Sequence, residues 1–195
     1  MSTHSPRTAL LTTALAAMLA TGLLAGCGKV ADSVSEATSE KAAEKMIEAQ
    51  INQNGGNAKV DLSSGGVTAE GTDENGKAFK MEMGNAKVTE QELGLPFYPG
   101  AQPVADKGTR MRNGEMSMAS VELSSDAAPQ KVAEWYRGQL KGRGEGATVV
   151  DSSSNGELQL MIVRDKPVQE SMQVHVGPAS EGGGSTITLM HSTGK

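Results

Sequence analysis

The sequence predicts an α+β fold with an N-terminal signal helix and helical tether, a small β meander, and a C-terminal antiparallel sheet packed with one helix (β-β-α-β-β-β-β). After residue 55, short segments of alternating apolar and polar residues recur, separated by Gly and Asn. Among them, 127–141 has apolar residues at helical spacing. Many strands with one helix are typical of an antiparallel sheet with one covered face. The predicted segments are the signal helix (1–26), the tether (27–54), the meander with its connector (55–100) and the C-terminal sheet with its helix (101–195).

The first segment has the composition of an export signal. Arg7 and the terminal amine form a basic start, an apolar run of about 16 residues follows, and the first acidic residue is Asp32. A membrane-spanning helix needs roughly 20 apolar residues, so the run is too short to be a transmembrane anchor. We therefore expect residues 1–26 to be a signal peptide.

The end of this segment, Leu24-Ala25-Gly26-Cys27, resembles the lipobox of bacterial lipoproteins. In that family the Cys sulfur receives a diacylglyceryl group, the chain is cut before the Cys, and the new amine receives an acyl chain such as palmitate. The resemblance implies that Cys27 is the lipidation site and that its lipid makes the membrane a partner. Two or three acyl chains, at about 0.8 kcal/mol per buried CH2, give a stable anchor. An ordinary secretory signal with an incidental Cys is the alternative.

The resemblance also implies a location. Gly28 follows the Cys, where an Asp would be the usual inner-membrane retention signal in enteric bacteria. We therefore expect a protein of the bacterial cell envelope, anchored in the outer membrane and facing the periplasm.

The composition of the mature chain excludes some classes of function. Cys27 is the only cysteine, so once lipidated it leaves no thiol for disulfides, redox chemistry or thiolate metal sites. The full chain has a formal charge of −5, and loss of Arg7 with the signal makes the remainder more negative. An acidic chain lacks the basic surface that binds nucleic acid or anionic lipid head groups, so no nucleic-acid partner is expected.

Residues 29–53 are rich in Ala, Glu and Lys and predict a helix. Its apolar residues form a thin stripe, and Glu44 and Glu48 are a like-charge pair one turn apart, which opposes helix formation. We interpret the segment as a spacer between membrane and domain. A coiled-coil or partner helix is the alternative, although no sustained heptad supports it.

The segments that follow predict strands and turns. Residues 54–57 end the helix, and Gly65-Gly66 and Asn75-Gly76 are turns of the expected meander. Residues 84–100 predict an extended connector, and Asn113-Gly114 predicts a hairpin. The remaining elements are the helix 127–141, with Trp135 and Tyr136 between the layers, and strands at 59–62, 67–70, 78–83, 147–151, 158–163, 172–176 and 187–189.

The order of tether, meander, the segment 96–101 (Pro-Phe-Tyr-Pro-Gly-Ala) and a helix carrying Trp135-Tyr136 resembles uncharacterised envelope lipoproteins of bacteria with a YPGA-type α+β domain. This resemblance covers most of the mature chain. That family has no assigned activity, so the resemblance implies location and architecture without a mechanism.

Two pairs of methionines are candidate metal ligands. Met81 and Met83 form one pair, Met116 and Met118 form the other, and Met111 is nearby in the expected hairpin. Residues i and i+2 of a strand share a face, and thioethers are soft ligands that suit Cu(I). Met is also a flexible filler of apolar cores, which would give the same spacing.

Other polar residues suggest little chemistry. His175 and His191 fall on or just after the last two expected strands, where Glu170 or Glu181 could complete a metal site, but nothing fixes that spacing and we interpret both as surface histidines. No Gly-x-Ser-x-Gly motif is present. We therefore expect no enzyme activity and no cofactor.

The expected function is a lipid-anchored envelope protein that acts as a non-catalytic binding or structural module, with another envelope protein as a candidate partner. The alternative is a periplasmic protein that binds a soft metal (copper) or a small ligand through Met side chains.

Overall fold

The computed structural model describes residues 32–62, 65–154, 157–165, 168–180 and 182–194. The expected signal helix and Cys27 lie outside these residues. Within them, no helix combines the length and the apolar character needed to cross a membrane.

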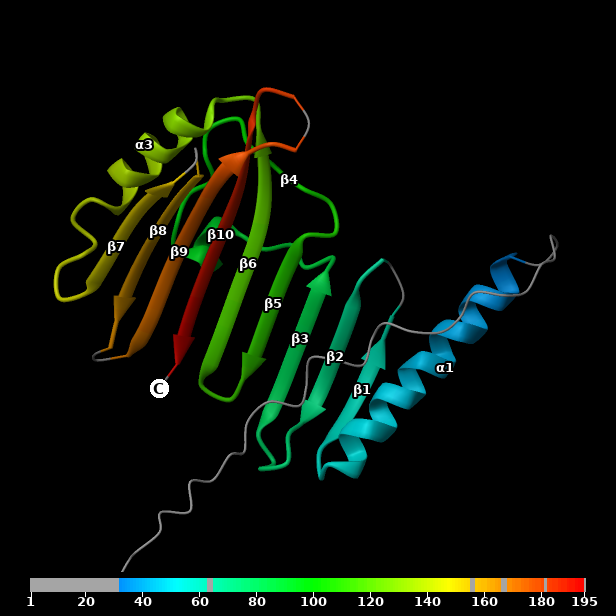
Figure 1. Cartoon of the computed structure of the whole chain (residues 1–195). Coiled ribbons are helices and arrows are strands. Elements are labelled where there is room, and N and C mark those ends of the chain that lie inside the picture. The colour runs from blue at the N-terminus through cyan, green and yellow to red at the C-terminus, as the bar shows by residue number, and fades with distance from the viewer. Residues whose placement is uncertain (1–31, 63–64, 155–156, 166–167, 181, 195) are drawn as a thin grey trace, which may run out of the picture.

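The described chain forms one antiparallel sheet of ten strands with three helices, which confirms an α+β fold that is mostly antiparallel sheet (Figure 1). The helices are α1 (Asp32–Gln53), α2 (Glu90–Leu93) and α3 (Pro129–Leu140). From one edge to the other, the strand order is β1 (Asn57–Asp61), β2 (Val67–Thr72), β3 (Ala78–Gly84), β5 (Gly108–Asn113), β6 (Met116–Ser125), β10 (Ser185–Gly194), β9 (Gln169–Pro178), β8 (Glu157–Arg164) and β7 (Thr148–Ser154). The two-residue strand β4 (Gln102–Pro103) pairs with β6.

The sheet is continuous between the expected meander and the C-terminal part. Strand β3 pairs with β5 from Phe79 opposite Asn113 to Gly84 opposite Gly108. Hydrogen bonds therefore cross the boundary expected at residue 100, and the meander extends the larger sheet. The last strand, β10, lies in the interior of the sheet between β6 and β9.

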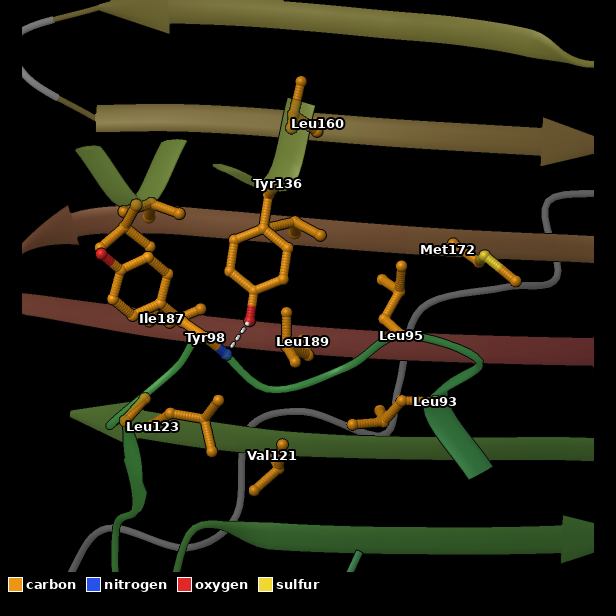
Figure 2. Close-up of a cluster of buried hydrophobic side chains, with 14 of the residues drawn as sticks. Leu93, Leu95, Tyr98, Val121, Leu123, Tyr136, Leu160, Met172, Ile187 and Leu189 are labelled. Carbon is orange, nitrogen blue, oxygen red and sulfur yellow. Dashed lines mark hydrogen bonds between the residues drawn. The ribbon is translucent and has the colours of Figure 1, made fainter. Parts of the chain in front are cut away.

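One face of the sheet carries the hydrophobic core. Alternate residues of β6, β8, β9 and β10 point to this face, and α3 and the segment 86–101 cover it (Figure 2). The side chains of Leu123, Ile187 and Leu189 have no exposed surface. We call this side of the sheet the core face.

Tyr136 of α3 joins the two layers. It is fully buried, and its hydroxyl accepts a hydrogen bond from the main-chain N–H of Tyr98 at 3.1 Å (Figure 2). The same hydroxyl donates one to the carbonyl of Pro96 at 3.3 Å. The ring of Trp135 lies edge-on to both tyrosine rings, at 5.5 Å from Tyr98 and 4.7 Å from Tyr136. Trp135 itself is half-buried. Burial raises the pKa of the Tyr136 hydroxyl above its ordinary value of 10.

The connector contains a short helix, α2, where the prolines of the sequence predict an extended chain. Thr89 begins it with a capping box, in which its hydroxyl accepts from the Glu92 N–H at 3.3 Å and Glu92 accepts from the Thr89 N–H at 3.0 Å. This Thr-x-x-Glu pattern is a local helix signal that outweighed the prolines further along. Leu93 of α2 is fully buried in the core.

Helix α1 lies alongside the edge strand β1 (Figure 1). Three main-chain N–H groups on this edge donate to its side chains: Ala58 to Asn52 at 3.4 Å, Val60 to Glu48 at 2.8 Å and Leu62 to Glu44 at 3.0 Å. The acceptors are four residues apart along α1, which corresponds to a rise of about 6 Å. The donors are two residues apart along the strand, which corresponds to about 6.7 Å, so the spacing of the acceptors matches that of the donors. Side chains thus occupy hydrogen-bonding groups that an edge strand otherwise leaves open to another chain.

Candidate functional site

The face of the sheet opposite the core carries most of the methionines. Of the 11 in the chain, Met1 and Met18 lie outside the described residues. Seven of the remaining nine point to this second face, as the strand registers show: Met81, Met83, Met111, Met116, Met118, Met161 and Met190. We call this surface the methionine face.

Three of these methionines form a row across adjacent strands. Met81 of β3 is directly opposite Met111 of β5, which is directly opposite Met118 of β6. Met83 and Met116 are two residues along their strands from this row, and so point to the same face. The four methionines that the sequence suggested as ligands therefore share one face, with Met111 between them.

The methionine face is partly open to solvent: Met81, Met111 and Met118 are half-buried, and Ala69, opposite Met81, is buried. The helices with contacts to the interior strands β6, β8, β9 and β10 are α2 and α3, and their buried side chains belong to the cluster on the core face. Met83 is 44% exposed and Met116 is 54% exposed, whereas Met172 on the core face is buried. Contiguous apolar side chains left in water are typical of a binding surface.

The methionine row carries no charge. Its neighbours on the same face include Thr109, Ser120 and Ser192, each opposite or next to a methionine. The charged residues of β3 and β5 alternate with the methionines and so point to the core face: Lys80, Glu82, Arg110 and Arg112.

Two of these charged side chains, Arg110 and Glu82, form an ion-pair network with Glu92 that holds α2 against the sheet. Arg110 donates to both carboxylate oxygens of Glu92, at 2.6 and 3.0 Å, and forms an ion pair with Glu82. Hydrogen bonds from Arg110 hold the pKa of Glu92 at about 2, below its ordinary value of 4.5. The same guanidinium donates to the carbonyl of Lys87 at 2.9 Å. The network therefore fixes the connector by three contacts to one arginine.

The two histidines do not meet. His175 is opposite Thr188 and His191 is opposite Met172, which places them on opposite faces of the paired strands β9 and β10. His191 Nε2 lies 3.1 Å from Glu170, and its Nδ1 lies 2.8 Å from the carbonyl of Glu92. Glu170 is also paired with Arg164. Glu181 lies outside the described residues.

The carboxylates and imidazoles of the described chain form no group of three or more that could hold a metal ion. A surface hollow of about 450 Å³ lies beside Arg143, Arg164 and Glu170. Three of its four charged side chains have partners, because Arg164 pairs with Glu170 and Arg143 donates to the carbonyl of Gly94 at 2.6 Å; the fourth is Glu145. Among the described residues, the methionine face is the candidate binding surface, because Met83 and Met116 there are large apolar side chains exposed to solvent.

Searches of protein-family models, curated proteins and solved structures found no match to this chain.

Part of this site was visible in the sequence and part was not. The i,i+2 pairs place Met81 with Met83 and Met116 with Met118. The central position of Met111 depends on two strand pairings. The β3–β5 pairing joins residues about 30 positions apart, and the β5–β6 pairing joins residues on either side of a tight hairpin. The hairpin signal at 113–114 could have placed Met111 opposite Met118.

Proposed function

We propose that the mature protein is a non-catalytic binding module of the bacterial envelope, anchored in the outer membrane by lipid on Cys27 and facing the periplasm. In this proposal, residues 1–26 are the signal helix that is removed, and 27–54 carry the lipid and the tether. The C-terminal part, in the order β-β-α-β-β-β-β, presents the methionine face together with the strands of the meander.

The exposed methionine face is the observation that carries the binding role. A folded protein rarely leaves a run of large apolar side chains in water, because burying them releases about 25 cal/mol per Å². Methionine has three rotatable bonds and a polarizable sulfur, so a surface made of it adapts to an apolar partner. We infer that another envelope protein docks here.

The lipobox supports the anchor, and metabolic labelling tests it. Cells that express the full chain are grown with radioactive palmitate, beside cells that express Cys27→Ser. The wild-type chain should carry label and the variant should carry none. Label retained by the variant would refute the anchor at Cys27.

Crosslinking in intact cells tests the binding surface. A photoreactive amino acid replaces Met83 or Met116 on the methionine face, and Val149 of β7 as the control, because Met116 and Val149 are both 54% exposed. Both methionine positions should give the same discrete adduct, and Val149 should not. No adduct at either methionine, or the same adduct at all three positions, contradicts docking on this face.

A further inference from the structure

We propose that Met81, Met111 and Met118 together bind one soft monovalent metal cation, Cu(I) or its chemical analogue Ag(I). This inference rests on the proposed function in one respect, which is the use of the methionine face as a binding surface. It names a metal ligand for that face, and its test does not depend on whether a protein partner binds there.

The registers bring three thioethers within reach of one another. Directly opposite residues of antiparallel strands have Cβ atoms about 5 Å apart, and Met111 has such a neighbour on either side. Each side chain has three rotatable bonds, so the sulfurs of Met81 and Met118 can turn toward that of Met111. Three neutral sulfur ligands on one side of an ion are the set that soft cations prefer.

The distribution of methionine in this chain argues against simple apolar filling. The buried cluster on the core face is built from Leu, Val, Ile, Ala and Tyr, and contains Met172 as its methionine. On the opposite face of β3, β5 and β6, the large apolar side chains are five methionines and Phe79. Branched aliphatic residues on this face lie on other strands, among them Val67 on β2, Val150 on β7 and Val163 on β8, so the thioethers are concentrated at the row.

The surroundings of the row fit a soft cation and not a hard one. Mg²⁺ and Ca²⁺ require oxygen ligands, and the row itself contains no carboxylate. Glu122, the acidic residue of β6, is four residues along the strand from Met118. Lys80, Arg110 and Arg112 point to the core face, so no Lys or Arg of β3, β5 or β6 shares the face of the methionine row, where it would repel a cation.

Methyl NMR of the full lipidated chain in detergent tests the site. Methionine methyl groups are labelled with ¹³C, any free thiol is blocked with iodoacetamide, and silver nitrate is titrated. The methyl resonances of Met81, Met111 and Met118 should shift and saturate, while those of Met46 and Met172 stay in place. An unchanged spectrum, or shifts spread equally over all methionines, overturns the proposal.

Matched variants give the second readout. The triple variant Met81→Leu/Met111→Leu/Met118→Leu keeps the apolar volume, because Leu and Met exchange with little effect on folding. The control, Met161→Leu/Met190→Leu, alters the same face outside the row. Competition with a chromophoric Cu(I) chelator should show affinity at least about tenfold lower in the triple variant and unchanged in the control, where tenfold is about 1.4 kcal/mol. Equal affinities in both variants overturn the site.

The two proposals fail in different ways. Saturable silver shifts without a crosslinked adduct would leave the metal site standing and remove the protein partner. An adduct from Met83 and Met116 without silver shifts would do the reverse.

Discussion

Replacement of Tyr136 by Phe should destabilise the protein by about 1–3 kcal/mol, the cost of leaving a buried polar group unsatisfied. The substitution keeps the ring and its edge-on contact with Trp135, and removes the oxygen that accepts from Tyr98 at 3.1 Å and donates to Pro96 at 3.3 Å. The Tyr98 N–H then has no acceptor in a buried position. The loss of stability therefore reports the hydrogen bond and not the packing.

Urea unfolding of the wild-type chain and of Tyr136→Phe measures this difference. Tyr98→Phe is the matched control, because it removes a hydroxyl from the same cluster and leaves the main-chain N–H in place. The midpoint should fall in Tyr136→Phe with an unchanged slope. A change below about 0.3 kcal/mol, or one equal to that of the control, would refute the view that Tyr136 holds the connector against α3.

Three further predictions concern other contacts. Because Arg110 holds the pKa of Glu92 at about 2, below 4.5, the contribution of this carboxylate to stability is complete above pH 4.5 and is lost as the pH falls toward 2. Urea unfolding from pH 6 to pH 3 should show a loss of at most about 2 kcal/mol, since each pH unit below 4.5 costs about 1.4 kcal/mol, and Glu92→Gln should reduce this loss; an unaltered pH profile in that variant would contradict the assignment. Glu48→Ala should cost about 0.5–1.5 kcal/mol and speed hydrogen exchange of the Val60 amide, whereas unchanged exchange would show that α1 does not cap β1. Gly108→Ala should cost about 1–3 kcal/mol, because a Cβ there would lie 1.9 Å from a carbonyl oxygen of the connector; a thermal melt identical to that of Gly183→Ala, where a Cβ has open space and the backbone is not left-handed, would refute the close approach.

The class of fold was predictable because alternation and helical spacing are local properties of the chain. The apolar residues of 127–141 indicated the helix that spans Pro129–Leu140, and Asn113-Gly114 indicated the hairpin of β5 and β6. Alternation cannot say which strand lies beside which. The pairing of β3 with β5 across the connector, and the placing of β10 in the interior, depend on contacts between residues far apart in sequence.

The same limit applies to the candidate site. His175 and His191 were expected on neighbouring strands, and β9 and β10 are neighbours, but an offset of one residue in register decides whether two side chains share a face. Glu44 and Glu48 are a like-charge pair that is unfavourable in an isolated helix. Their role depends on the contact with β1, where each carboxylate accepts a hydrogen bond from a main-chain N–H, and helix propensity alone does not predict that contact.

The contact between α1 and β1 also has a mechanical consequence. The acceptors Glu44, Glu48 and Asn52 meet Leu62, Val60 and Ala58 in reverse order, so the helix runs antiparallel to the strand and its hydrogen bonds lie across that direction. Tension on the N-terminal end of α1, where the lipid is proposed, would load these bonds in shear, all together and not one after another. A pull from the membrane would thus be resisted along the edge of the sheet before it reached the core.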